Sequence, residues 1–224
     1  PGYGDSVPLA AAAPEITDYA DAMLRSLDAL GIEVVDLYGF HTGAHIAIEM
    51  ALAAPQRVRR VVLDGLLVLD DAAREDFLAH YAPEIRPDAA GLQFTWAVNY
   101  IRDQAWFFPH FRRDAAHNLG RGAMSAEVLH YLATELVKAI GTYHLGYRAV
   151  FRHRVVERLR DLRQPTLLTA DASDPTRAGL ATIAAHCPQL HCELLEPSED
   201  PARTPDKAGR IDAFLSPAPR ESRT

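Results

Sequence analysis

The 224-residue sequence contains few cysteines, no excess of basic residues and no long hydrophobic run. Its two cysteines, Cys187 and Cys192, are too few for the disulfide framework of small secreted proteins. Its 23 lysines and arginines are outnumbered by 30 acidic residues, whereas nucleic-acid binders usually carry a basic excess. No segment approaches the roughly 20 apolar residues that cross a bilayer. These absences exclude a disulfide scaffold and indicate that neither a nucleic acid nor a membrane is a partner.

Signals for secretion are also missing near the beginning of the chain. The apolar segment Pro8–Ala13 has neither a basic leader nor a cleavage pattern, so we expect a cytoplasmic protein. The chain opens Pro1-Gly2-Tyr3-Gly4 without an initiator methionine, and we expect further residues upstream of Pro1. Hydrophobic residues make up 48% and charged residues 24%, which are ordinary globular proportions, and the length suffices for one well-filled core.

Strand and helix patterns alternate near both ends of the chain. Short β-branched apolar runs predict buried strands, and apolar residues at helical spacing predict helices. The predicted strands are Val34–Tyr38, Arg60–Leu63, Thr166–Thr169 and His191–Leu195, and the predicted helices are Pro14–Leu30, Gly43–Ala54, Arg177–His186 and Asp206–Leu215. This alternation predicts an α/β fold, with a mostly parallel sheet and helices on both faces.

The middle of the chain has a different pattern. Residues 67–163 are helical in periodicity, richer in aromatic and charged residues, and contain no convincing strand. We therefore divide the chain into an α/β core over 1–66 and 164–216, an inserted helical lid over 67–163 and a polar tail over 217–224.

The turn Gly39-Phe40-His41-Thr42-Gly43 joins the first predicted strand to its following helix. Two glycines around one polar residue at a strand-to-helix turn are typical of a nucleophile elbow, which holds its central side chain out over the edge of the sheet. The backbone N–H of Thr42, at the helix N-terminus, is then placed to stabilise an anion. The turn is therefore the first candidate for a functional site.

These segments together resemble the α/β-hydrolase-fold superfamily, in particular its lid-bearing esterases, haloalkane dehalogenases and epoxide hydrolases. Pro1–Ser6 resembles the loop after the fourth strand of such proteins, and Leu30–Gly65 follows their elbow strand, elbow helix and next strand. Pro165–Thr176 resembles the strand that presents the catalytic acid, and Arg210–Leu215 resembles their last helix. The resemblance implies an α/β-hydrolase fold whose N-terminal strands and second oxyanion donor lie upstream of Pro1.

The elbow departs from the family pattern at its central residue. Members of the superfamily carry Ser, Cys or Asp there, whereas this chain carries His41. An imidazole attacks acyl groups itself or acts as a general base on water, but it supplies no hydroxyl for a serine mechanism. The other interpretation is that the nucleophile has been lost and His41 only fills an exposed turn.

The resemblance places the triad acid at Asp174, after the strand that ends at Ala170, and Asp64 is a second acid position that some members use. Asp174 also suits a cap on a helix that begins near Pro175. The triad histidine should precede the last helix, but the segment from Leu195 to Pro201 contains none. A standard serine mechanism is therefore excluded, and we expect no labelling by fluorophosphonate probes.

Two groups of residues have the composition of metal ligands. His41, His45 and Glu49 are spaced by four, which on a continuous helix puts a plausible zinc set on one face. Because His41 lies on the elbow before the helix begins, we expect no metal and no cofactor. The pairs His186-Cys187 and His191-Cys192 are better explained as core cysteines beside surface histidines.

The predicted lid contains six aromatic residues within sixteen positions, namely Trp96, Tyr100, Trp106, Phe107, Phe108 and Phe111. Aromatic residues this dense either wall an apolar pocket or form the lid's own core. We expect the core role for most of them. We assign substrate binding to Trp106, Phe107 and Phe108, because three consecutive aromatics cannot all face one side of a helix. The pair Arg112-Arg113 and the run Arg152–Arg154 suit an anionic substrate group or a solvated face.

Our first hypothesis from the sequence is a hydrolase acting on a small, partly apolar ester or lactone. His41 would be the base or nucleophile, the Thr42 N–H the oxyanion donor and Asp174 the neighbouring carboxylate. The alternatives are a non-catalytic ligand-binding protein, or a lyase or cofactor-independent oxygenase of the same fold. A small molecule is the expected partner, and the sequence leaves open whether the protein is a monomer or a homodimer.

Overall fold

The structure, a computed structural model, describes residues 1–195 and 204–216. It contains two compact units. One unit consists of Pro1–Tyr19 and Leu69–His153, and the other of Ala20–Val68 and Arg154–Thr224. Helix α1 (Ile16–Ala29) begins in the first unit and continues into the second. The second unit, called the sheet unit below, contains the predicted elbow, and the first is called the helical unit.

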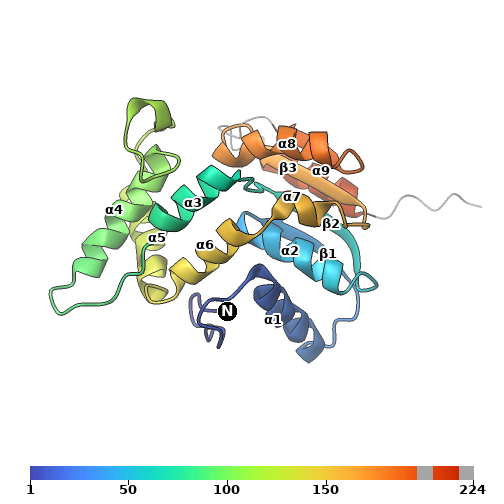
Figure 1. The fold of residues 1–224 in the computed structure, drawn as a ribbon, viewed down its shortest axis with the longest axis horizontal. Helices are drawn as coiled ribbons and strands as arrows, with labels where there is room; N and C mark the ends of the chain where they lie inside the picture. The colour runs from blue at the N-terminus through green and yellow to red at the C-terminus, as the bar shows by residue number, and fades with distance from the viewer. Residues whose placement is uncertain (196–203, 217–224) are drawn as a thin grey trace, which may run out of the picture. The chain divides into compact units, whose positions relative to one another are not determined.

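Four parallel strands form the sheet, in the order β1 (Val35–Phe40), β2 (Val58–Asp64), β3 (Thr166–Asp171) and β4 (His191–Leu195) (Figure 1). All four predicted strands are confirmed, and β4 has the predicted bounds. Strand β1 extends to Phe40 because Phe40 pairs with Asp64, and β2 begins at Val58 because Val58 pairs with Val35. Backbone pairing therefore lengthens both strands beyond the apolar runs that predicted them.

One face of the sheet packs against helices α2 (Thr42–Ala53), α7 (Val155–Leu159) and α8 (Ala178–His186). The core on this face includes Ile48 of α2, Leu63 of β2, Leu168 of β3 and Ile183 of α8, all fully buried. These strand residues alternate with ones that point to the opposite face, as the two-residue period of a strand requires.

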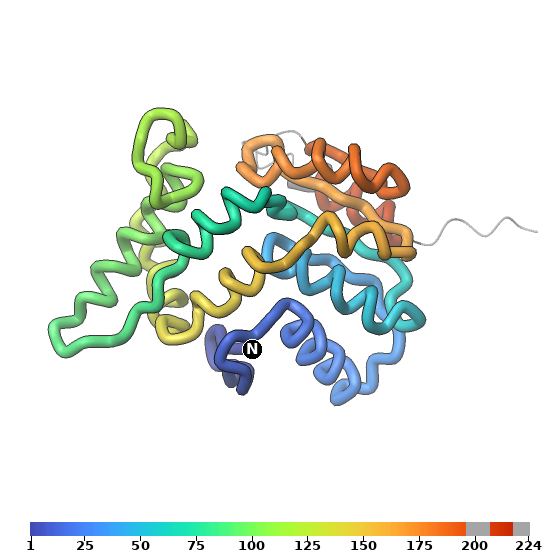
Figure 2. Tube along the Cα trace, viewed as in Figure 1, coloured from blue at the N-terminus to red at the C-terminus, as the bar shows by residue number. Residues whose placement is uncertain are grey.

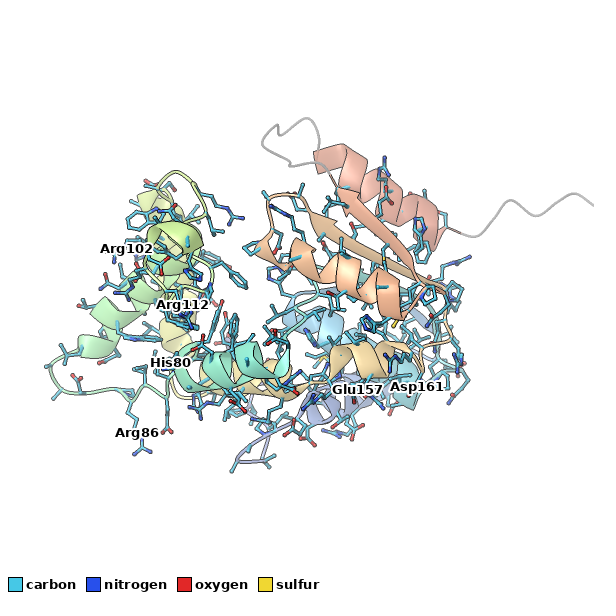
Figure 3. All side chains as sticks on the ribbon, turned by 45° about the horizontal axis from the view of Figure 1, so that its top comes forward. His80, Arg86, Arg102, Arg112, Glu157 and Asp161 are labelled. Atoms are coloured by element: carbon cyan, nitrogen blue, oxygen red, sulfur yellow. The ribbon has the colours of Figure 1, made fainter. Side chains whose placement is uncertain are left out.

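The opposite face is covered by α9 (Thr204–Leu215), so β3 and β4 lie between α8 and α9 (Figure 3). Two contacts attach α9 to β2: Lys207 Nζ lies 2.6 Å from Asp64 Oδ2, and Arg60 donates to the carbonyl oxygen of Leu215. Helices therefore cover both faces, as predicted.

The helical unit contains α3 (Asp71–His80), α4 (Leu92–Trp106), the short 3₁₀ helix η1 (Ala115–His117), α5 (Ala126–Lys138) and α6 (Tyr143–Arg152); the path of the chain can be followed in Figure 2. The structure describes every residue from 65 to 165, and this stretch adds no strand to the sheet. Aromatic packing forms the unit's core, where the ring of Phe77 contacts Tyr81, Phe111 and Phe151. Tyr100 is 4% exposed, which confirms the core role for this residue.

Within the helical unit, hydrogen bonds and an ion pair hold residues 1–15 against α6 and the residue before it. The Tyr3 hydroxyl donates to the carbonyl oxygen of Tyr143, and the Thr142 hydroxyl donates to that of Gly2. Arg152 pairs with Glu15 across 2.7 Å. No helix within the described ranges is long and apolar enough to span a membrane.

Candidate functional site

The backbone of His41 is strained. Its φ of 47° and ψ of −112° make it the one residue other than glycine with a positive φ in the part of the chain that the structure describes. Such a conformation costs of the order of 1–3 kcal/mol and persists where neighbouring structure enforces it. Here the His41 N–H donates to the carbonyl oxygen of Asp64, and the His41 carbonyl accepts from the N–H of Ala44 at the start of α2. The strand end and the helix start therefore both hold the turn.

Of the two glycines that predicted this turn, only Gly39 is required by close packing. A Cβ on Gly39 would overlap the carbonyl group of Gly43 and lie against the Cα of Ala44. A Cβ on Gly43 would meet nothing within 4 Å. The tight approach of β1 to the first turn of α2 thus depends on Gly39, and Gly43 contributes its backbone to that contact.

The imidazole of His41 bonds directly to Asp174. Its Nε2 lies 2.7 Å from Asp174 Oδ2, and the two side chains are 46% and 14% exposed. Asp174 follows β3, whose carboxyl end lies at the same edge of the parallel sheet as that of β1. Two residues that are distant in the sequence are brought together by this topology.

The carboxylate of Asp174 is fixed by bonds to both of its oxygens. Oδ1 accepts from the backbone N–H of Thr176 at 2.8 Å and from the Thr176 hydroxyl at 2.7 Å, which caps the 3₁₀ helix η2 (Pro175–Arg177). The other oxygen, Oδ2, is the one that contacts Nε2 of His41. The capping interpretation of Asp174 and its placement beside the elbow are therefore compatible, because each uses a different oxygen.

The protonation of the pair follows from these bonds. Burial alone would raise the pKa of Asp174, but the hydrogen bonds from His41 and Thr176 outweigh it and lower the pKa to about 2. Asp174 is then ionised at neutral pH and only accepts, so in neutral His41 the proton lies on Nε2. The Nδ1 lone pair remains available on the other edge of the ring.

Gly65 provides the space for the ring. It has a φ of +67°, and a Cβ there would overlap Cδ2 of His41 and lie 2.7 Å from its Nε2 and 3.3 Å from Asp174 Oδ2. The Phe40 ring stacks on the imidazole with ring centroids 3.8 Å apart. The Cδ2–Nε2 edge therefore faces Gly65 and Asp174, and the edge that carries Nδ1 faces away from them.

Asp64, the second acid position, bonds to other groups. It is fully buried, and its Oδ2 accepts from the Tyr38 hydroxyl at 2.6 Å as well as pairing with Lys207. Burial, and then the hydrogen bond to Asp64, hold the pKa of Tyr38 well above its usual range. The imidazole bonds Asp174, and Asp64 contributes its carbonyl oxygen to the turn.

The three residues of the suggested zinc set do not come together at one position. Glu49 is 3% exposed and accepts from Arg158 Nε at 2.7 Å and Nη2 at 2.8 Å. His45 is buried within α2, whereas His41 lies on the elbow beside Asp174. No three potential ligands converge on a metal position within residues 1–195 and 204–216. Cys187 is a buried free thiol, Cys192 is partly buried, and His186 and His191 are exposed.

Thr42 is the first residue of α2, so its N–H is one of those that an α-helix leaves without an intrahelical acceptor. Its role as an oxyanion donor stays a prediction. Trp106, Phe107 and Phe108 belong to the helical unit, where Arg102 lies over the Trp106 ring and Phe108 packs edge-on against Phe77. Their role as a substrate wall also stays a prediction.

Arg112 and Arg113 of the helical unit are both engaged in ion pairs. Arg112 pairs with Asp76 at 2.6 Å, and Arg113 pairs with Asp103 at 2.8 Å. Arg102, which also pairs with Asp103, and Arg112 are labelled in Figure 3. These contacts favour the interpretation of Arg112 and Arg113 as paired surface charges over a free anion site.

Sequence reasoning missed four residues that shape the site. Thr176 had a usable signal, because a hydroxyl residue two positions after Asp is typical of a local turn. Gly65 was placed at the end of the segment that resembles the elbow region of the family, but it was not identified as a contact of His41. Tyr38 and Lys207 gave no signal, because their partner Asp64 is distant in the sequence.

Comparison with known proteins gives consistent matches. A family model described as alpha/beta hydrolase fold matches residues 1–201. A protein from Azorhizobium caulinodans, named putative carbamate hydrolase RutD, is 33% identical over 162 residues, which are 71% of this chain and 56% of that protein. The chain thus spans little more than half the length of this relative.

Two solved structures share the fold at low identity. A carboxylesterase structure from the thaumarchaeon Nitrososphaera gargenis matches with a TM-score of 0.66 at 14% identity, covering 96% of this chain and 77% of that one. The enol-lactonase from Burkholderia xenovorans matches with a TM-score of 0.62 at 15% identity and the same coverages. At these identities, the likeness concerns the fold alone.

Proposed function

This chain belongs to the α/β-hydrolase fold family, and from that membership we propose that it is a hydrolase of a small, partly apolar ester or lactone, with His41 as its general base. The observation that carries the proposal is the direct bond between the elbow residue His41 and the ionised carboxylate of Asp174. The names of the relatives, which include a carbamate hydrolase, a carboxylesterase and an enol-lactonase, support a carbonyl substrate.

The proposed reaction uses the two ring nitrogens for different tasks. Nε2–H donates to Asp174, which fixes the tautomer and stabilises the imidazolium that forms during the reaction. Nδ1 removes a proton from a water molecule, and the resulting hydroxide attacks the substrate carbonyl. Nδ1–H then returns that proton to the leaving alcohol, so the ester and water become an acid and an alcohol and His41 is regenerated.

The backbone of the elbow would stabilise the charge that develops on the substrate. In this proposal the Thr42 N–H donates to the carbonyl oxygen as it becomes negative, assisted by the positive end of the α2 dipole. The strain at His41 favours this interpretation over a passive turn, because glycine at the same position would avoid the cost.

The first test is turnover of a panel of p-nitrophenyl esters, a carbamate and a lactone by the purified protein and by His41→Ala. We expect His41→Ala to lower kcat by about 10²–10⁴-fold, the usual contribution of a general base. His186→Ala removes an exposed histidine on α8 and should leave turnover unchanged. Equal turnover by the wild type and His41→Ala would overturn the proposal. Saturable binding of these compounds without any turnover would instead support a non-catalytic binding protein.

A further inference from the structure

The sheet face under α9 carries a row of polar residues. Asp64 of β2, Thr169 of β3 and Glu193 of β4 occupy paired positions across the sheet, and Asp64 and Thr169 are almost completely buried. A carboxylate in such a place needs partners, because removing it from water is costly. Helix α9 supplies two cations one turn apart, since Lys207 pairs with Asp64 and Arg210 pairs with Glu193.

Lys207 differs from Arg210 because it reaches the elbow. Its ammonium lies 5.9 Å from the centroid of the Phe40 ring, within the range of a cation–π contact. Phe40 in turn stacks on the imidazole of His41, with an angle of 21° between the ring planes. Lys207 is therefore linked to His41 through one aromatic ring.

Asp64 provides a second link between Lys207 and His41. Its main-chain oxygen accepts from the N–H of His41 at 2.9 Å, while its carboxylate bonds Lys207. Within the described residues, Asp64 Oδ1 has no hydrogen-bond partner, so the carboxylate depends on Oδ2, where Tyr38 and Lys207 meet it. Loss of Lys207 would leave a buried carboxylate with one donor, and such a group moves or draws in water.

We propose that Lys207 is a positioning residue for His41, a role that rests on the proposed function. By holding Phe40 and Asp64, it keeps the imidazole in the orientation in which Nε2 meets Asp174 and Nδ1 faces away. Phe40 needs such a restraint, because it is the last residue of β1 and is 49% exposed. A displacement of about 1 Å in a catalytic group lowers the rate by up to ~10²-fold. A residue that takes no part in the reaction can therefore control the rate by positioning that group.

The first experiment compares Lys207→Met with the matched control Arg210→Met, which removes the neighbouring ion pair of the same helix. Nuclear magnetic resonance of the imidazole protons, assigned by their absence in His41→Ala, reports the stacking of His41 on Phe40. We expect Lys207→Met to shift these signals towards their positions in Phe40→Leu, where the ring current is absent. Lys207→Arg and Arg210→Met should leave them near the wild-type positions.

Turnover gives a second measurement. We expect Lys207→Met to lower kcat by about 10–100-fold with a small change in KM, and to have no further effect in the His41→Ala background. If Lys207→Met does not fold, the double variant Asp64→Asn/Lys207→Met, which removes both buried charges, is measured in its place with the same expectations.

Unchanged His41 signals in Lys207→Met or in that double variant, or equal shifts in Arg210→Met, would overturn the positioning role. The failure of the proposed function has a different signature. It would be seen as a wild-type protein without turnover, in which case the imidazole signals still decide whether Lys207 positions His41.

Discussion

Three contacts hold the imidazole of His41, and each comes from a different part of the sheet unit. Phe40 of β1 stacks on its face, Asp174 after β3 bonds its Nε2, and Gly65 after β2 leaves room for its edge. The His41 side chain is nevertheless 46% exposed, and the edge that carries Nδ1 faces away from Gly65 and Asp174. An ordered ring with one accessible nitrogen suits a general base better than a residue that only fills a turn.

The strain at His41 can be measured by comparing two substitutions. His41→Ala and His41→Gly both remove the ring and its bond to Asp174, so their difference reports the backbone. Glycine avoids a strain of about 1–3 kcal/mol but adds roughly 0.4–1 kcal/mol of unfolded-state entropy. We expect His41→Gly to be the more stable by about 1 kcal/mol in urea unfolding. A more stable His41→Ala would mean that the positive φ costs less than the unfolded-state entropy that glycine adds.

The pKa of Asp174 predicts a pH dependence of stability. Because the folded state lowers this pKa from 3.8 to about 2, ionised Asp174 stabilises the fold above pH 3.8, and the contribution disappears as the pH falls towards 2. The free energy of unfolding should therefore decrease more in the wild type than in Asp174→Asn as the pH falls from 3.8 towards 2. Asp174→Asn retains the side-chain oxygen that caps η2. A difference between the two proteins that stays constant with pH would contradict the assignment.

At the scale of elements, the sequence predicted the elbow from Gly39, His41 and Gly43 because strand-to-helix turns leave a local signal. The four strands were predicted because buried parallel strands are continuous apolar runs. The ends of β1 and β2 were not predicted, because they depend on which residues pair across the sheet. The network of Tyr38, Asp64 and Lys207 was missed because it also depends on contacts between distant segments. Pairings between distant segments leave no periodicity in the sequence.

Gly65 allows a test of how the strand ends shape the site. Gly65→Ala places a Cβ against the ring of His41, whereas Gly31→Ala has the same φ of +67° and its Cβ meets nothing within 4 Å. Both variants share the backbone cost of a positive φ, so their difference isolates the contact with His41. We expect Gly65→Ala to lower kcat by up to about 10²-fold, and Gly31→Ala to leave it near wild type. Equal turnover would show that the ring adapts without loss.

At the scale of the whole molecule, the family, the parallel sheet and the helical middle of the chain were predictable from the order of the segments. The division into two units was less predictable. Residues 1–19 belong to the same unit as 69–153, held by contacts such as those of Tyr3 and Arg152 that join distant parts of the sequence. The substrate role of Trp106, Phe107 and Phe108 remains a prediction, because these residues and His41 belong to different units.

The absence of an elbow serine predicts the behaviour of the intact protein towards serine-directed probes. Ser6, Ser26, Ser125 and Ser173 lie outside the elbow, and Ser198 lies outside the described residues. Ser26 donates to a carbonyl of its own helix, and the side chain of Ser125 caps α5, so both have structural partners. We expect no stoichiometric labelling by a fluorophosphonate in intact-mass measurements. Labelling at one of these serines would show that the elbow has been assigned wrongly.

Chemical rescue tests the claim that the imidazole at the elbow performs the chemistry with Asp174. His41→Gly removes the ring and relieves the strained backbone, and free imidazole is then added during turnover of an ester that the wild type hydrolyses. We predict a saturable rise in turnover with imidazole concentration, and none above the solution background in His41→Gly/Asp174→Asn. A His41→Gly protein as active as wild type, or one that imidazole does not rescue, would contradict the claim.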